Sequence, residues 1–223
     1  MKFVHLKTLL WKELKGELRT KEVLSSMLVF SLLVVAAFGF ALDLDRAETG
    51  KVLPGIIWVT LTFAGILALN RSFAVELQND CIYGLMQTPA SRSTIYFAKL
   101  IMNLLLMVVV EIVIVPLFFI MLNYPVPPHL WLLVVVLALG TYCFMAVGTF
   151  LSALAAGTRV SEMLLPLLML PMIMPVLLSS TLVTRGAFEL VPTNIGIFLK
   201  LLGTYAVIFT VLPALLFDHL LEV

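Results

Sequence analysis

Residues 100–122 read LIMNLLLMVVVEIVIVPLFFIML, and this apolar stretch decides the fold class. It contains a single charged side chain, Glu111. A helix of roughly 20 apolar residues is long enough to cross the ~30 Å hydrocarbon core of a bilayer. The stretch therefore predicts a transmembrane helix.

Five more runs of similar length and character occur in the chain of 223 residues. They are Ser25–Leu42, Val52–Leu69, Leu130–Leu154, Met163–Val183 and Ile195–Phe217. The composition agrees, because 62% of the residues are hydrophobic and only 12% are charged, whereas about a quarter of a globular sequence is charged. We expect an all-α integral membrane protein with six transmembrane helices and an amphipathic interfacial helix before them.

The positions of the cationic residues predict the orientation. If the six spans alternate, ten of the 14 Lys and Arg residues fall on the side of the N-terminus and four on the other side. Cationic residues favour the cytoplasmic side of membrane proteins. We therefore expect a multi-pass protein of the bacterial plasma (inner) membrane with both termini in the cytoplasm. A cleaved signal peptide is disfavoured, since the charged stretch before the first apolar run is long and no small-residue cleavage site stands out.

Residues 1–24 predict an amphipathic helix at the membrane interface. One broad face of the helical wheel is apolar; it holds Phe3, Val4, Leu6, Leu10, Trp11, Leu14 and Leu18. Such a helix can lie on membrane lipid, with Trp11 at headgroup depth and lysines toward anionic headgroups. A simple basic anchor that sets the orientation is an equally good and compatible interpretation. Residues 1–223 are expected to form one transmembrane permease domain.

The longest polar interruption runs from residue 70 to residue 99, on the predicted cytoplasmic side. The sequence predicts partial helix here, continuing the second span, with Ser72 able to cap it. The segment has more apolar side chains than a solvated linker needs. They therefore either lie on the membrane or fill a groove on another protein.

No motif for nucleotide binding, catalysis or a metal site is found in the sequence. Gly50-Lys51 resembles the end of a phosphate-binding loop, but Val52 follows where Ser or Thr is required. The three histidines are scattered and lack the spacing of metal ligands. We therefore expect no catalytic residue, no metal, no tightly bound cofactor and no nucleic-acid partner. Any ATP-driven role needs a separate ATPase subunit.

One candidate for function inside the spans is a lone carboxyl. Glu111 lies near the middle of the third span, five residues before Pro116, and a carboxyl at the bilayer centre costs about 2.5 kcal/mol or more. In one interpretation Glu111 lines a transport path or pairs across a subunit interface. In the other it is a structural carboxyl, hydrogen-bonded to Asn103, Thr141 or a partner's helix.

A second candidate is the fifth span, which carries three prolines within ten residues, at Pro166, Pro171 and Pro175. Each proline removes a backbone donor and clashes with the preceding turn. The prolines indicate either tolerated kinks or a jointed helix that moves when a pathway opens.

The central block of the chain resembles a known family. The residues concerned are Trp58-Val59-Thr60, Leu67 to Phe73, Glu76, Gly84-Leu85-Met86, Pro89, Arg92-Ser93 and Lys99-Leu100. A second block is Leu164 to Leu168 with Pro171 and Pro175, after Arg159 and Glu162; Leu216-Phe217-Asp218 closes the match. Together they are similar to the membrane subunit of the cytochrome c maturation haem exporter, the CcmB family.

The resemblance implies an ABC-2-like permease that works with a CcmA-type ATPase subunit, a CcmC-type haem-handling membrane subunit and a small CcmD-type membrane protein. Haem is then a possible transported substrate. Release of a haem-loaded periplasmic chaperone by ATP-driven motion stays open as the alternative. The residues expected to dock the ATPase are Asn70, Arg71, Phe73, Glu76, Tyr83, Gly84, Leu85, Pro89 and Arg92. Glu111, Pro116 and the three prolines of the fifth span are expected in the moving part.

Two other hypotheses compete with cytochrome c maturation. One is a permease of the same type that exports another hydrophobic compound. The other is a membrane scaffold that recruits assembly factors and transports nothing. Co-purification with an ATPase separates the scaffold from the two transporters, and loss of c-type cytochromes alone separates the transporters from each other.

Overall fold

The computed structural model describes residues 2–42, 46–78, 92–156, 161–189 and 195–220. This part of the chain contains seven helices and no strand. The helices are α1 (Lys2–Thr20), α2 (Glu22–Ala41), α3 (Arg46–Gln78), α5 (Arg92–Met121), α6 (Leu130–Ala156), α7 (Ser161–Phe188) and α8 (Ile195–Leu220).

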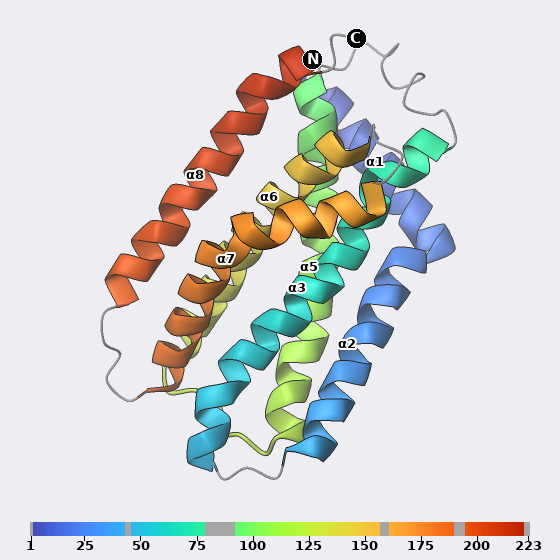
Figure 1. Ribbon diagram of the computed structural model, residues 1–223. Coiled ribbons are helices and arrows are strands. Elements are labelled where there is room, and N and C mark those ends of the chain that lie inside the picture. The colour runs from blue at the N-terminus through green and yellow to red at the C-terminus, as the bar shows by residue number, and fades with distance from the viewer. Residues whose placement is uncertain (1, 43–45, 79–91, 157–160, 190–194, 221–223) are drawn as a thin grey trace.

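Six of the described helices, α2 to α8, are long and apolar enough to cross a membrane. They coincide with the six predicted spans, so the predicted fold class is confirmed. Figure 1 shows the spanning helices side by side, with the start of α1 and the end of α8 at one end of the bundle. The end of α3 and the start of α5 lie at that same end. We call it the α1 end of the bundle.

A sharp turn joins α1 to α2. Lys21 adopts a left-handed conformation, with φ of 53°. The carboxylate of Glu17 accepts a hydrogen bond of 2.8 Å from the backbone N–H of Leu24. A free N–H in the first turn of α2 is thereby satisfied by a side chain from α1. The turn fixes the direction in which α1 leaves the first span.

Helices α3 and α6 approach each other closely through glycines. A Cβ atom added to Gly65 of α3 would clash with the ring of Phe144, and one added to Gly148 of α6 would clash with the side chain of Leu69. Small residues permit such close backbone approach between membrane helices. The packing of α3 against α6 therefore leaves no room for a side chain at either glycine.

A hydrogen bond joins α3 to α7. Trp58 of α3 donates its indole N–H to the hydroxyl of Thr184 on α7, at 2.9 Å. Both side chains are buried. A buried indole needs an acceptor, so this bond helps to fix the distance between the two helices.

Helix α7 is bent. Its first part runs across the bundle and its second part runs along it (Figure 1). The three prolines predicted to kink this span all lie inside the helix, and each removes a backbone donor. The sequence predicts a bend, and the structure adds its direction.

Helix α1 directs two acidic side chains toward the bundle. Glu13, which stands on the charged face of the helical wheel, and Glu17, which interrupts the apolar face, are only partly exposed and line a pocket that α5 also borders. On the apolar face, Trp11 and Leu18 are 64% and 62% exposed, which is compatible with contact to membrane lipid. Glu13 faces the bundle because its carboxylate pairs with Lys99, a buried cation on α5 that is described below.

Candidate functional site

Helix α3 does not stop where its apolar run ends. It continues through Ser72 to Gln78, so Ser72 is an interior helix residue rather than a cap. We call the turn Leu69–Ser72 the junction, because the apolar span of α3 passes here into its polar extension. Side chains from several other helices meet at this turn.

Lys99 of α5 makes the central contact with the junction. Its side chain is only 3% exposed. The ammonium donates a hydrogen bond to the backbone carbonyl of Ser72, and it lies 3.6 Å from the carboxylate of Glu13 on α1. A buried cation needs a partner charge and hydrogen-bond acceptors. Lys99 therefore ties α5, α3 and α1 together.

Asn103 lies one turn further along α5 and faces the same place. Its amide donates to the hydroxyls of Ser72 and of Thr149 on α6, each at 3.1 Å. From α6, the hydroxyl of Ser152 donates to the carbonyl of Leu69 at 2.7 Å. The junction is thus hydrogen-bonded to both α5 and α6.

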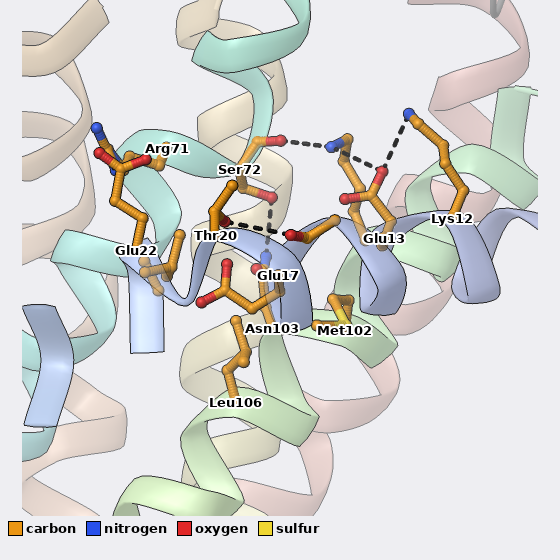
Figure 2. Close-up of a pocket in the computed structure, with 14 residues that line it drawn as sticks. Lys12, Glu13, Glu17, Thr20, Glu22, Arg71, Ser72, Met102, Asn103 and Leu106 are labelled. Atoms are coloured by element: carbon orange, nitrogen blue, oxygen red, sulfur yellow. Dashed lines mark hydrogen bonds and ion pairs between the residues drawn. The ribbon is translucent and has the colours of Figure 1, made fainter. Parts of the chain in front are cut away.

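A pocket of about 310 Å³ opens beside the junction and is lined by residues of α1, α2, α3 and α5. Figure 2 shows Glu22 and Arg71 on one side of it and Lys12 and Glu13 on the other. Arg71 and Glu22 form an ion pair of 2.5 Å, in which both side chains are exposed. The pocket therefore has charged walls of both signs.

The structure describes only part of the predicted docking segment. Asn70 and Arg71 lie in the junction, and the buried amide oxygen of Asn70 has no hydrogen-bond donor among the described residues. Phe73 and Glu76 lie on the extension of α3, and Arg92 is the first residue of α5; their side chains are outside the described part. The remaining four are outside the described residues altogether: Tyr83, Gly84, Leu85 and Pro89.

A second candidate site is a groove of about 610 Å³ between α5 and α6, toward the other end of the bundle. Its walls include Ile112, Pro116 and Phe119 of α5 and Leu133 of α6. Among the described residues that line it, Glu111 alone carries a polar side chain. The volume lies within the ~300–1,000 Å³ range of small-molecule sites.

Glu111 is buried where it borders this groove. The hydroxyl of Thr141 on α6 donates a hydrogen bond to its carboxyl oxygen. Thr141 is one of the partners expected from the sequence. Asn103, another of them, bonds to the junction instead.

The residues predicted for the moving part lie in two regions. Glu111 and Pro116 both line the groove between α5 and α6. The three prolines of α7 are not among its lining residues, and α7 packs chiefly against α6, α3 and α8. Helices α3, α6 and α8 each pack against both α5 and α7, so they connect the two regions.

The sequence alone does not single out Lys99, Asn103 or Glu13 as site residues. A signal is present, because Lys99 and Asn103 stand four residues apart at the polar edge of an apolar run, and residues four apart share a helix face. The partner Glu13 lies far earlier in the chain, so no local pattern connects it to Lys99.

Nothing in the described part of the chain gathers three or more His, Cys, Asp or Glu side chains as a metal site would require. Cys143, one of the two cysteines, is buried, and its thiol donates to the carbonyl of Leu202 at 3.2 Å. The chemistry at hand is hydrogen bonding, ion pairing and apolar contact.

Comparison with known proteins agrees with this picture. A family model described as "CcmB protein" matches residues 4–223. The chain belongs to the CcmB family. Three relatives bear the name heme exporter protein B, from Rhodobacter capsulatus, Paracoccus denitrificans and Pseudomonas aeruginosa.

The similarity to these CcmB proteins extends over most of each chain. The Rhodobacter protein is 31% identical over 183 residues, which cover 82% of this chain and 84% of its own. The Paracoccus protein is 29% identical over 195 residues, covering 87% and 89%. The Pseudomonas protein is 27% identical over 208 residues, covering 92% and 91%. The family resemblance inferred from the central block is confirmed over nearly the whole chain.

Proposed function

We propose that this chain is the membrane subunit of an ABC transporter that serves cytochrome c maturation. In this proposal ATP is hydrolysed by a separate CcmA-type subunit. The resulting motion either exports haem or releases a haem-loaded periplasmic chaperone. A CcmC-type haem-handling subunit and a small CcmD-type protein complete the assembly.

The observation that carries the proposal is the match to the CcmB family over residues 4–223. The alignments with relatives named as heme exporters cover more than four fifths of the chain. The architecture is compatible with a permease, because six of the described helices can span a membrane. Polar contacts are gathered at the α1 end of the bundle, where a peripheral subunit could bind.

The experiment that tests the proposal is deletion of the gene in its native host, followed by measurement of cytochromes. We expect loss of c-type cytochromes with normal b-type cytochromes, and restoration by the wild-type chain. Affinity purification from native membranes should recover an ATPase and a haem-handling subunit. Normal c-type cytochromes in the deletion strain would contradict the proposal.

A second part of the proposal is that the ATPase docks on residues 70–99. The supporting observation is that α3 continues as a helix beyond its apolar span to Gln78. A continuous helix transmits a force applied at its end to the span it belongs to, whereas an irregular loop would change conformation instead. Its junction is bonded to α5 and α6, so a force applied to the extension reaches at least three spans.

The groove at Glu111 is proposed as the contact for an apolar ligand or a partner helix during transport. Its lining is apolar apart from one carboxyl, and a lone polar group in an apolar site fixes the orientation of what binds there. Pro116 and the prolines of α7 are proposed as the points where helices bend during the cycle. Prolines free backbone carbonyls inside a helix, and neighbouring groups can satisfy them in more than one way.

A further inference from the structure

We propose that the ion pair between buried Lys99 and partly exposed Glu13 is the link that makes α1 move together with the junction of α3. This inference rests on the proposed function, because it names positioning residues for coupled transport. Lys99 and Glu13 act through the helices they join and touch no transported compound.

The contacts of Lys99 make it a shared partner of three helices. It belongs to α5, it donates to the carbonyl of Ser72 in α3, and it lies 3.6 Å from the carboxylate of Glu13 in α1. Two other ion pairs line the pocket beside the junction. The pair between Arg71 and Glu22 has side chains 42% and 58% exposed. The pair between Lys12 and Glu13 lies within α1, and its Lys12 side chain is 49% exposed. Exposed pairs contribute little because water replaces either partner. Because Lys99 is only 3% exposed, its pair with Glu13 is the one that constrains α1.

Burial explains why the link persists when the helices move. A buried cation that loses its partner charge is strongly destabilised, and the side chain of Lys99 is buried. If the junction shifts and carries Lys99 with it, Glu13 must follow. Glu13 lies one turn before Glu17, which bonds the first turn of α2, so the motion is passed on to the start of the first span.

The pocket beside the junction gives α1 room to move. It measures about 310 Å³, and residues of α1, α3 and α5 line it (Figure 2). Where α3 faces α6 the packing is close, since a Cβ at Gly65 would clash with Phe144. Close-packed interfaces shift as units rather than deform. Displacement is therefore easiest at the α1 side of the junction.

The test uses the assembled complex in a strain whose own copy of the gene is deleted. The variants are Glu13→Gln, Lys99→Met, the two combined, and Lys99→Arg, which keeps the cation. The matched control is Glu189→Gln, which removes an exposed ion pair with Arg185 at the opposite end of the bundle. Three quantities are measured: the amount of assembled complex, its ATP hydrolysis, and the c-type cytochrome made per complex.

We expect Glu13→Gln and Lys99→Met to lower cytochrome made per complex by about fivefold or more, the lower end of usual coupling between sites. ATP hydrolysis per complex should persist. The combined variant should be no worse than Lys99→Met alone, because both changes break the same link. Lys99→Arg should retain most of the wild-type yield, and Glu189→Gln should behave like the wild type.

Normal maturation with Glu13→Gln would overturn the inference, as would additive losses in the combined variant. A purely structural role would also overturn it; it would show as loss of assembled complex in step with maturation. Failure of the proposed function is distinguishable, because c-type cytochromes would then be normal even in the deletion strain without any copy of the chain.

Discussion

Among individual residues, Glu111 is the clearest case of a polar group accommodated in an apolar span. Its carboxyl accepts a hydrogen bond from Thr141 on α6 and otherwise borders an apolar groove. A polar group buried among apolar side chains is costly unless it is hydrogen-bonded. The bond to Thr141 therefore holds Glu111 in place and also joins α5 to α6.

Glu111→Gln should be much milder than Glu111→Leu. The amide keeps an acceptor for Thr141, whereas Leu leaves that hydroxyl without its partner, at about 0.6 kcal/mol on average and up to ~1.7 kcal/mol for hydrogen bonds in membranes. The measurement is the thermal unfolding midpoint of the purified protein, together with cytochrome made per complex. Thr141→Val is the companion variant and should lower stability at least as much as Glu111→Leu, because it leaves the buried carboxyl of Glu111 without its donor. Equal loss of maturation with Gln and Leu would show that the charge itself is needed.

Gly65 gives a second prediction for a single residue. Gly65→Ala places a Cβ against the ring of buried Phe144, and overpacking of this kind costs about 1–3 kcal/mol. The control is Gly55→Ala in the same helix, where nothing lies within 4 Å of the added atom. We expect a lower unfolding midpoint for the first and no loss for the second. Similar midpoints would mean that α3 and α6 are less closely packed than described.

Among the helices, the length of the apolar runs predicts the spans, and the sequence after the second run predicts that helix continues beyond it. The second apolar run ends at Leu69, whereas α3 continues to Gln78. Side chains of α5 and α6 bond to the junction and support the helix there, which hydropathy does not register. In α1, Glu13 stands on the charged face of the helical wheel, and only the three-dimensional position of Lys99 explains why it faces the bundle.

The extension of α3 leads to a test of docking. Phe73→Asp should let the protein insert normally but uncouple ATP hydrolysis from maturation, because an apolar contact with the ATPase is replaced by a charge. Leu85→Asp should act in the same way. The check is cytochrome made per ATP hydrolysed by the assembled complex, and Phe73→Leu, which keeps an apolar side chain, is the matched control. Normal maturation in both Asp variants would remove the docking role from residues 70–99.

Helix α7 gives a prediction about bending. Pro171→Ala restores a backbone donor and should straighten the helix, raising its stability while lowering maturation. Pro213→Ala in α8 is the control, since α8 carries a proline inside the helix but has no predicted joint. Levels of inserted protein and of c-type cytochrome are compared. Full maturation in Pro171→Ala would mean that the bend only shapes the packing of α7 and is not a moving joint.

For the bundle as a whole, the described helices form six spans with polar contacts gathered at the α1 end and an apolar groove toward the other. Composition and run length are enough to predict the six spans, because the hydrocarbon core requires apolar side chains and its thickness sets the length of each run. The sequence predicts the groove at Glu111 and the junction only in part. Glu111 stands out as a lone charge in an apolar run, although only packing decides between Thr141 and Asn103 as its partner. The junction depends on partners brought together from α1, α3, α5 and α6.

The proposed coupling requires that the bundle is driven from the cytoplasmic side, through the segment that joins α3 to α5. The most direct test is labelling of Cys81 in that segment with a membrane-impermeant thiol reagent; the other cysteine, Cys143, is buried. We expect no labelling in intact spheroplasts and clear labelling in inside-out vesicles stripped of peripheral proteins. Labelling of Cys81 in intact spheroplasts would place the segment outside and rule out this form of coupling.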